Sequence, residues 1–140
     1  MLSKKFGNKI IVRIDRGEEI LTILKKVCED HKIRAGSVQG IGALSKAEIG
    51  LIDLKTKQYK TRKIEGGIYE VTSLLGNITI MNGEIRLHTH ITLGDENCNT
   101  IGGHLFMGEV GVTCEVIITE MDADIGRKLD PELGVNLLDF

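Results

Sequence analysis

Three of the four histidines in the chain fall close together, at positions 88, 90 and 104. Residues two apart on a β-strand project from the same face, about 7 Å apart along the strand. Both imidazoles of the pair His88 and His90 can therefore turn toward one ion at a Zn–N distance of about 2 Å. The pair predicts a metal site, provided that these residues lie on a strand.

His104 completes this set if the strand that follows folds back. The polar segment Asp95–Asn99 predicts a five-residue hairpin loop. Gly94 then pairs with Thr100, and His90 faces His104 with Cβ atoms about 5 Å apart. Three imidazoles leave a fourth coordination position open, which is typical of catalytic rather than structural zinc sites. We therefore predict that the three histidines bind zinc or a similar divalent metal.

Other residues are candidates for roles beside the metal. Arg86 lies two residues before His88 and should project from the same face of the predicted strand. It could hold a substrate carboxylate. Alternatively, it could be a solvated residue or pair with an acid at a subunit interface. Glu70 and Glu115, on predicted neighbouring strands, could act as general acid or base or orient an imidazole, or they could form structural ion pairs. His31 ends a predicted helix, and this position favours a role as a cation that caps the C-terminal end of that helix.

Hydrophobic periodicity predicts one helix and many strands. Apolar residues recur at spacings of three and four over Gly17–His31, with acidic residues in the first turn. The dipeptide Asn82-Gly83 predicts a type I′ hairpin turn, and Gly76-Asn77 predicts another turn. Alternating or β-rich segments predict the following strands: 8–15, 37–43, 46–54, 58–64, 67–75, 78–81, 84–93, 112–121 and, as an added edge strand, 135–140.

This order of elements predicts an α+β fold with a largely antiparallel, curved β-sheet and one main N-terminal helix. The 140 residues fit a single domain, residues 1–140, without a linker or repeat. One helix covers little of a large sheet, so self-association is expected.

Composition excludes several classes of protein. Hydrophobic residues make up 41% and charged residues 27%, which is typical of a globular domain and not of a disordered or fibrous chain. No apolar run approaches the roughly 20 residues that span a bilayer, and no signal-peptide core is present, so no membrane contact is expected. Three cysteines without a CxxC motif predict reduced thiols and a cytoplasmic location.

The sequence resembles the plants-and-prokaryotes conserved (PPC) domain, in its stand-alone prokaryotic form. The resemblance covers about residues 9–122, leaving a tail of residues 123–140. It implies an α+β domain that assembles as a homotrimer. The wider fold is similar to acetolactate decarboxylase, whose zinc is held by an HxH pair and a later histidine. This similarity implies the metal-ligand role for the three histidines, but the enzymatic activity does not carry over with it, because the spacing to the third histidine differs. The resemblance rests on four segments in order: residues 36–45, 70–78, 87–90 and 102–105.

Plant members of the family carry AT-hook segments that bind DNA, and prokaryotic members are labelled DNA-binding by association. An AT-hook needs an Arg-Gly-Arg-Pro core, whereas the one proline here, Pro131, follows Asp130. A net charge of −2 also gives no general attraction for nucleic acid. One basic cluster could meet phosphate, but protection of a hairpin edge explains it better: Lys55, Lys57, Lys60, Arg62 and Lys63.

Three functions remain open at this point. The first is a metal-binding domain with an open coordination position that acts on a small oxygen-rich molecule. The second is a DNA-associated, transcription-related module, and the third is a trimeric scaffold with a structural metal. The sequence leaves open whether the protein is an enzyme.

Overall fold

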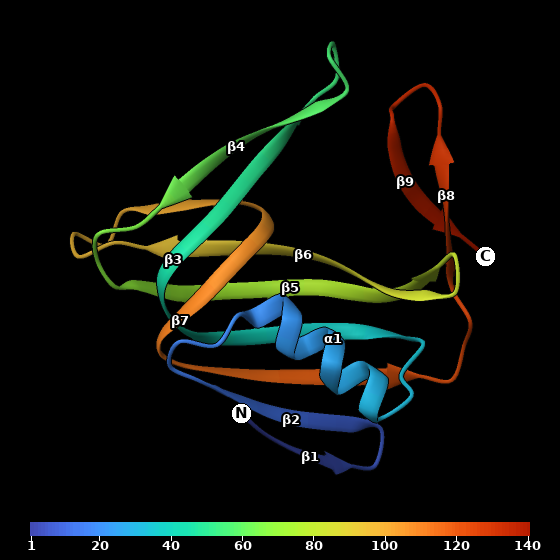
Figure 1. Ribbon diagram of the computed structural model, residues 1–140, viewed down its shortest axis with the longest axis horizontal. Helices are drawn as coiled ribbons and strands as arrows, with labels where there is room; N and C mark the ends of the chain where they lie inside the picture. The colour runs from blue at the N-terminus through green and yellow to red at the C-terminus, as the bar shows by residue number, and fades with distance from the viewer.

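Nine strands and one helix make up the chain, and the computed structural model describes all 140 residues (Figure 1). All strand pairings are antiparallel. The predicted α+β fold with an antiparallel sheet and one N-terminal helix is confirmed. The elements are β1 (Leu2–Phe6), β2 (Lys9–Asp15), α1 (Ile20–Asp30), β3 (Ala35–Asp53), β4 (Gln58–Ile64), β5 (Tyr69–Met81), β6 (Glu84–Gly94), β7 (Thr100–Met121), β8 (Gly126–Asp130) and β9 (Val135–Asp139).

Seven strands form the main sheet in the order β1-β2-β7-β6-β5-β3-β4. An additional pairing of β3 with β7 joins two strands that this order separates, so β3, β5, β6 and β7 close into a barrel-like ring. The long strands β3 and β7 bend sharply to take part in it (Figure 1). Only β1 and β4 remain as edges of this sheet.

The helix α1 packs its apolar face against β6 and β7. Ile20, Leu24 and Val27 are fully buried, as the three-and-four spacing requires. The helix begins at Ile20 rather than at Gly17, because the Glu19 carboxylate caps it by accepting from the backbone N–H of two residues in its first turn. No helix is long and apolar enough to cross a membrane.

Several predicted element boundaries are wrong. Gly76 and Asn77 are not a turn but lie inside the continuous strand β5, and the two segments predicted at 37–43 and 46–54 form the single strand β3. A register shift between Gly40 and Gly42 bends β3 without ending it. Glycine in these strands permits close packing of backbone rather than a reversal of the chain.

The two ends of the chain also differ from expectation. β1 was not predicted, because its residues Leu2–Phe6 are all exposed and lack alternation. β9 does not extend the main sheet as an edge strand: it pairs with β8 in a separate two-stranded sheet. Asp130 makes the turn of this hairpin, accepting from the backbone N–H of Glu132 and Leu133, as the Asp-Pro sequence suggests.

Replacing Gly76 by alanine should destabilise the protein. A Cβ atom there would lie 2.5 Å from the His88 carbonyl oxygen and 2.6 Å from Thr89 Cγ2, so β6 would have to move. We expect Gly76→Ala to lower the free energy of unfolding by about 1–3 kcal/mol in urea unfolding. The control is Gly94→Ala on β6, where the nearest atom would lie at an ordinary 3.6 Å. Equal stability of both variants would contradict this account.

Candidate metal centre

The hairpin between β6 and β7 positions the three histidines. Within its loop, the Asp95 carboxylate accepts from the backbone N–H of Asn97 and Asn99, which fixes a five-residue connection. Gly94 consequently pairs with Thr100, and His90 pairs with His104. The predicted loop length and register are both confirmed.

The three imidazoles converge. Their ligand atoms all lie within 4.8 Å of one another, and the Nε2 atoms of His88 and His90 are 3.2 Å apart. Two nitrogens bound to one tetrahedral zinc ion at about 2.0–2.1 Å are separated by about 3.3 Å. The cluster therefore fits a single divalent ion without rearrangement of the strands. No other group of three or more potential ligands occurs in the chain.

The surroundings of His88 and His104 favour the neutral imidazole, which is the form that binds metal. Burial, with smaller effects from the other two histidines and Arg127, lowers the pKa of His104 to about 4. Burial and then Arg127 also lower the pKa of His88. The Nδ1 atom of His104 is buried and lacks a hydrogen-bond partner, so this ring carries a lone pair or proton that nothing in the protein satisfies.

Two aromatic rings hold His104 in place. The ring of Phe106 lies 4.7 Å from it and the ring of Tyr59 lies 5.2 Å from it, centroid to centroid. Tyr59 and Phe106 in turn meet edge to face at 5.0 Å. Tyr59 comes from β4, which sequence analysis did not connect with the site. Only the pairing of β4 with β3 brings it there.

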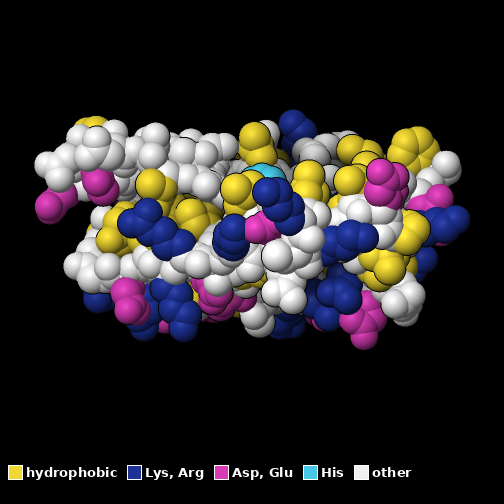
Figure 2. Space-filling view, turned by 90° about the horizontal axis from the view of Figure 1, so that it is seen from above, with side chains coloured by type: hydrophobic (Ala, Val, Ile, Leu, Met, Phe, Trp, Pro, Cys, Tyr) yellow, Lys and Arg dark blue, Asp and Glu magenta, His cyan; other side chains and the backbone are white.

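The histidines lie at the base of a cavity of about 690 Å³ between two β-arms. One arm is the β3–β4 hairpin, and the other is the β8–β9 hairpin (Figure 1). In the space-filling view, histidine surface shows between hydrophobic and basic side chains (Figure 2). The arms also touch: Lys57 Nζ donates to the Pro131 carbonyl oxygen at 2.8 Å.

Arg86 lines this cavity with the histidines, as its parity predicts, whereas the two predicted glutamates do not. Glu70 pairs across the sheet with Gly94 and Ala43, and Glu115 pairs with Arg13 and Ile41. Neither carboxylate is among the residues around the histidines. They lie on β5 and β7, which pair with β3 from opposite sides, so the prediction that they occupy neighbouring strands is wrong.

A second arginine, Arg127, reaches the same cavity from β8. It was not a predicted site residue, because it lies in the tail beyond the segments that resemble the family. Its Nη2 donates to Asn77 Oδ1 at 2.6 Å, and Asn77 pairs directly with His88. Burial lowers the pKa of its guanidinium. The pairing of Asn77 with His88 and the position of the β8–β9 hairpin together place the Arg127 guanidinium beside the histidine cluster.

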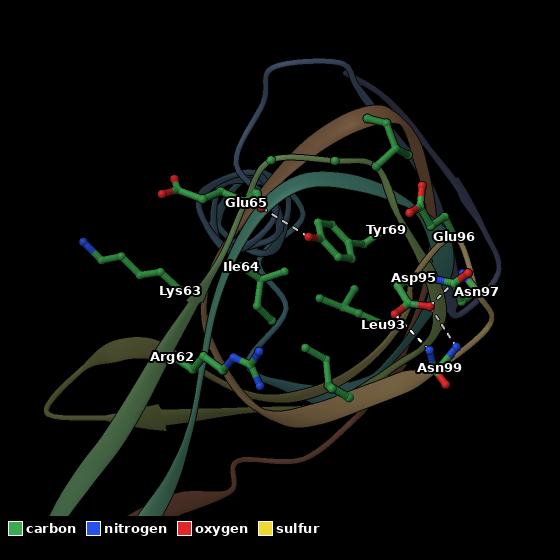
Figure 3. Close-up of a pocket in the computed structure, with 14 residues that line it drawn as sticks. Arg62, Lys63, Ile64, Glu65, Tyr69, Leu93, Asp95, Glu96, Asn97 and Asn99 are labelled. Atoms are coloured by element: carbon green, nitrogen blue, oxygen red, sulfur yellow. Dashed lines mark hydrogen bonds between the residues drawn. The ribbon is translucent and has the colours of Figure 1, made fainter.

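Another cavity, of about 450 Å³, lies at the opposite end of β4 (Figure 3). Arg62, Tyr69 and Asp95 are among the side chains around it. The Tyr69 hydroxyl donates to the Glu65 carbonyl oxygen. The Asp95 carboxylate already accepts hydrogen bonds from two backbone N–H groups of its own loop. This cavity contains no histidine and no group of metal ligands, so the histidine cavity is the better candidate site.

Comparison with known proteins identifies the family. A sequence model described as the Plants and Prokaryotes Conserved (PCC) domain matches residues 1–122. The chain belongs to the PCC domain family. This confirms the predicted resemblance and places the three histidines inside the PCC domain, with β8 and β9 beyond the matched region. No curated protein sequence matches the chain.

Several solved structures are closely similar to this chain. A protein from Bacteroides thetaiotaomicron with a provisional DNA-binding label has 34% identity and a TM-score of 0.95, over 99% of this chain and 96% of that one. A PPC protein from Pyrococcus horikoshii has 33% identity and a TM-score of 0.87, over 99% and 95%. A protein from Archaeoglobus fulgidus described as metal-containing has 28% identity and a TM-score of 0.87, over 98% and 97%.

A more distant similarity concerns the fold alone. Acetolactate decarboxylase from Bacillus subtilis shares 18% identity at a TM-score of 0.56, and the alignment covers 84% of this chain but 54% of that one. The predicted similarity of fold is confirmed. Activity does not follow from it, since the match is remote and the PCC chain spans about half of the enzyme.

The half-buried His104 should make the metal-free protein sensitive to acid. In the unfolded chain His104 takes up a proton near pH 6.5, but in the folded chain only near pH 4. The unfolded state therefore binds more protons between these values, and the free energy of unfolding falls as the pH drops through this window. We expect urea unfolding of chelator-treated protein to show this loss between pH 7.5 and 4.5.

The His104→Gln variant should lose less stability over the same pH range, because its residue 104 does not titrate. His31→Gln, which alters the end of α1 and not the cluster, should retain the wild-type pH dependence. The same pH dependence in wild type and His104→Gln would show that burial does not keep this imidazole neutral.

Proposed function

We propose that this PCC-domain protein binds one divalent metal ion, preferably zinc, through His88, His90 and His104, and holds a small oxygen-bearing molecule at the open coordination position. The observation that carries the proposal is the convergence of three ring nitrogens within 4.8 Å at the base of a cavity. Three neutral imidazoles favour zinc and leave room for a further ligand.

Three further observations support a metal here. Burial lowers the pKa of His104 to about 4, so its imidazole is available to a cation at neutral pH. The buried, unpartnered Nδ1 of His104 marks a polar atom that the fold alone does not satisfy. The similar protein from Archaeoglobus fulgidus is described as metal-containing.

The chemistry follows from this ligand set. When bound, a divalent ion would supply Lewis-acid polarisation of a carbonyl or hydroxyl oxygen. The residues of the chain supply the rest: Tyr59 and Phe106 hold the ring of His104, and Arg86 offers a cation at the cavity. Glu70 and Glu115 have no place in this proposal, because neither lines the cavity.

Metal analysis tests the proposal directly. Protein loaded with zinc and dialysed should contain one ion per chain. His88→Ala, His90→Ala and His104→Ala should each reduce the affinity strongly, by at least about tenfold, since each removes one of three ligands. His31→Ala is the matched control and should bind zinc like the wild type. Equal zinc content in the wild type and the His88→Ala/His90→Ala double variant would refute the site.

Cobalt substitution separates the open site from a purely structural one. The visible spectrum of a cobalt ion held by three histidines responds to the ligand in its remaining position. We expect added azide to change that spectrum if the position is open. A spectrum that azide leaves unchanged would favour the scaffold with a structural metal.

We also propose that the chain assembles as a homotrimer. The outer face of the sheet has a hollow lined by exposed apolar side chains, among them Ile11, Ile41 and Leu75, which are 42%, 60% and 58% exposed. An apolar patch of this kind on a β-sheet favours contact with another protein surface. A second and third copy of the chain would cover it.

Light scattering should accordingly give a particle of three times 15.4 kDa at micromolar concentration. Ile41→Asp should dissociate it, because a carboxylate would have to be buried in the contact. Leu54→Asp is the control, since Leu54 is equally exposed at 61% but lies in the turn between β3 and β4. A wild-type particle of 15.4 kDa would contradict the assembly.

DNA binding has weaker support than metal binding. The similar protein from Bacteroides thetaiotaomicron has a DNA-binding label, but the basic cluster of this chain lies on the edge strand β4 and its preceding turn. Lys60 of the cluster pairs with Asp53, and Lys57 contacts the Pro131 carbonyl. These contacts fit protection of an edge and closure of the two arms better than a phosphate-binding surface.

A further inference from the structure

The residues around the histidine cavity are unbalanced in charge. Arg86 and Arg127 line it together with the three histidines, but no aspartate or glutamate does. Neither arginine forms a salt bridge anywhere in the chain. A divalent ion on neutral imidazoles would add two more positive charges. Like charges this close, partly shielded from water, repel strongly unless an anion joins them.

Arg127 is held in a way that leaves part of its guanidinium available. Its Nε donates to Thr79 Oγ1 at 2.9 Å, its Nη2 to Asn77 Oδ1 at 2.6 Å and its Nη1 to the Asn136 carbonyl oxygen at 2.9 Å. A guanidinium has five N–H donors. Two are therefore left, one on each terminal nitrogen, and a pair of donors of this kind matches the two oxygens of a carboxylate.

The pairing of β5 with β6 fixes the position of the Arg127 guanidinium relative to the histidines. Asn77 and His88 are direct cross-strand partners on β5 and β6, and such residues have Cβ atoms about 5 Å apart. Thr79 lies two residues further along the same face of β5. Arg127 therefore sits beside the histidine cluster, held by three neutral groups that orient the cation without cancelling its charge.

Much of the remaining cavity wall is apolar. Leu51 and Ile52 come from the β3–β4 arm, and Val135, Leu137 and Leu138 come from the β8–β9 arm. Leu51 is 74% exposed although it faces this hollow, and Leu137 and Leu138 are 44% and 46% exposed. Apolar side chains that face each other across a hollow favour a ligand with a hydrocarbon part.

The geometry points to a small carboxylic acid with a short apolar tail as the occupant of this cavity, its carboxylate bound by Arg127 and its tail held between Leu51 and Leu137. This assignment rests on the proposed metal centre and names the class of molecule that the centre would hold. Arg86 adds positive charge at the same cavity. Arg127 is thus an anion-binding residue as well as a clamp on the β8–β9 hairpin.

Calorimetric titration of zinc-loaded protein tests this assignment with 2-hydroxy-4-methylpentanoate. This probe has a carboxylate, an adjacent oxygen for the metal and a branched apolar tail. We expect it to bind at least about tenfold more tightly than its neutral carboxamide, and at least about tenfold more tightly than glycolate, which lacks the tail. Carboxamide or inorganic phosphate binding as tightly as the acid would overturn the assignment.

Arg127→Gln distinguishes anion binding from a merely structural role. If Arg127 binds the carboxylate, the preference for acid over carboxamide should fall by at least about threefold, while Arg86 and the metal continue to favour an anion. If Arg127 only holds the hairpin, both ligands should weaken together and the preference should remain, which would overturn its assignment. Arg62→Gln, at the other cavity, is the control and should keep the wild-type preference. Arg127→Lys, which keeps the charge but loses the fork, should show an intermediate preference and replaces Arg127→Gln if that variant does not fold.

Zinc content, measured on every sample before titration, separates the two proposals. Protein that fails to bind zinc contradicts the metal centre itself. Protein that binds one zinc ion per chain but does not prefer the carboxylate contradicts only the carboxylate-binding assignment.

Discussion

The pairing of β3 with β7 is the contact on which the rest of the molecule depends. It runs from Ala35 opposite Met121 to Gly50 opposite His104, and it closes four of the seven strands of the main sheet into a ring. The closed ring has an inner face of buried apolar residues, with the helix packed against β6 and β7, and an outer face on which alternate side chains are free for other purposes. The same pairing brings Gly50 against His104, so the β3–β4 arm begins where the histidines are.

Ring closure also explains the chemistry of the site. His88 and His90 lie on the outer face of β6 because Thr89 and Ile91, between and beyond them, are buried in the core. Packing of Phe106 and Tyr59 around His104 then removes water from one side of the cluster. The strands therefore supply both the fixed spacing of the three imidazoles and the partial burial that lowers the pKa of His88 and His104.

Local patterns in the sequence were sufficient for much of this site. The alternation of β6, the Asn-Gly turn before it and the five-residue loop after it involve residues close in the chain, and they correctly position all three histidines. Arg127 and Tyr59 could not be found in this way, since each reaches the cavity through contacts between distant segments. The same limit applies to Glu70 and Glu115. Alternation along a strand predicts which face of the sheet a residue occupies, but it does not predict that β3 lies between the strands that carry these two residues.

Glycine was the main source of error in the predicted elements. The sequence predicts a turn at Gly76, yet a Cβ at this position would meet the backbone of β6, so glycine here permits the close approach of two paired strands. By contrast, Asn82 and Gly83 both have positive φ, at 53° and 81°, and do form the expected turn. A local sequence pattern does not distinguish a glycine that adopts a positive φ in a turn from a glycine that leaves room for a neighbouring strand.

The loop at Asp95–Asn99 has a consequence for how this family of chains can change. Because the five residues between Gly94 and Thr100 have no cross-strand partner, an insertion inside the loop can be absorbed there and leaves His90 opposite His104. An insertion of one residue within β7, between Thr100 and His104, would instead turn His104 to the other face, because successive side chains on a strand alternate between faces. The histidine cluster therefore constrains the few strand residues between the loop and His104 rather than the loop itself. In that sense the part of this hairpin that tolerates most change in length lies directly beside a part that tolerates no odd change.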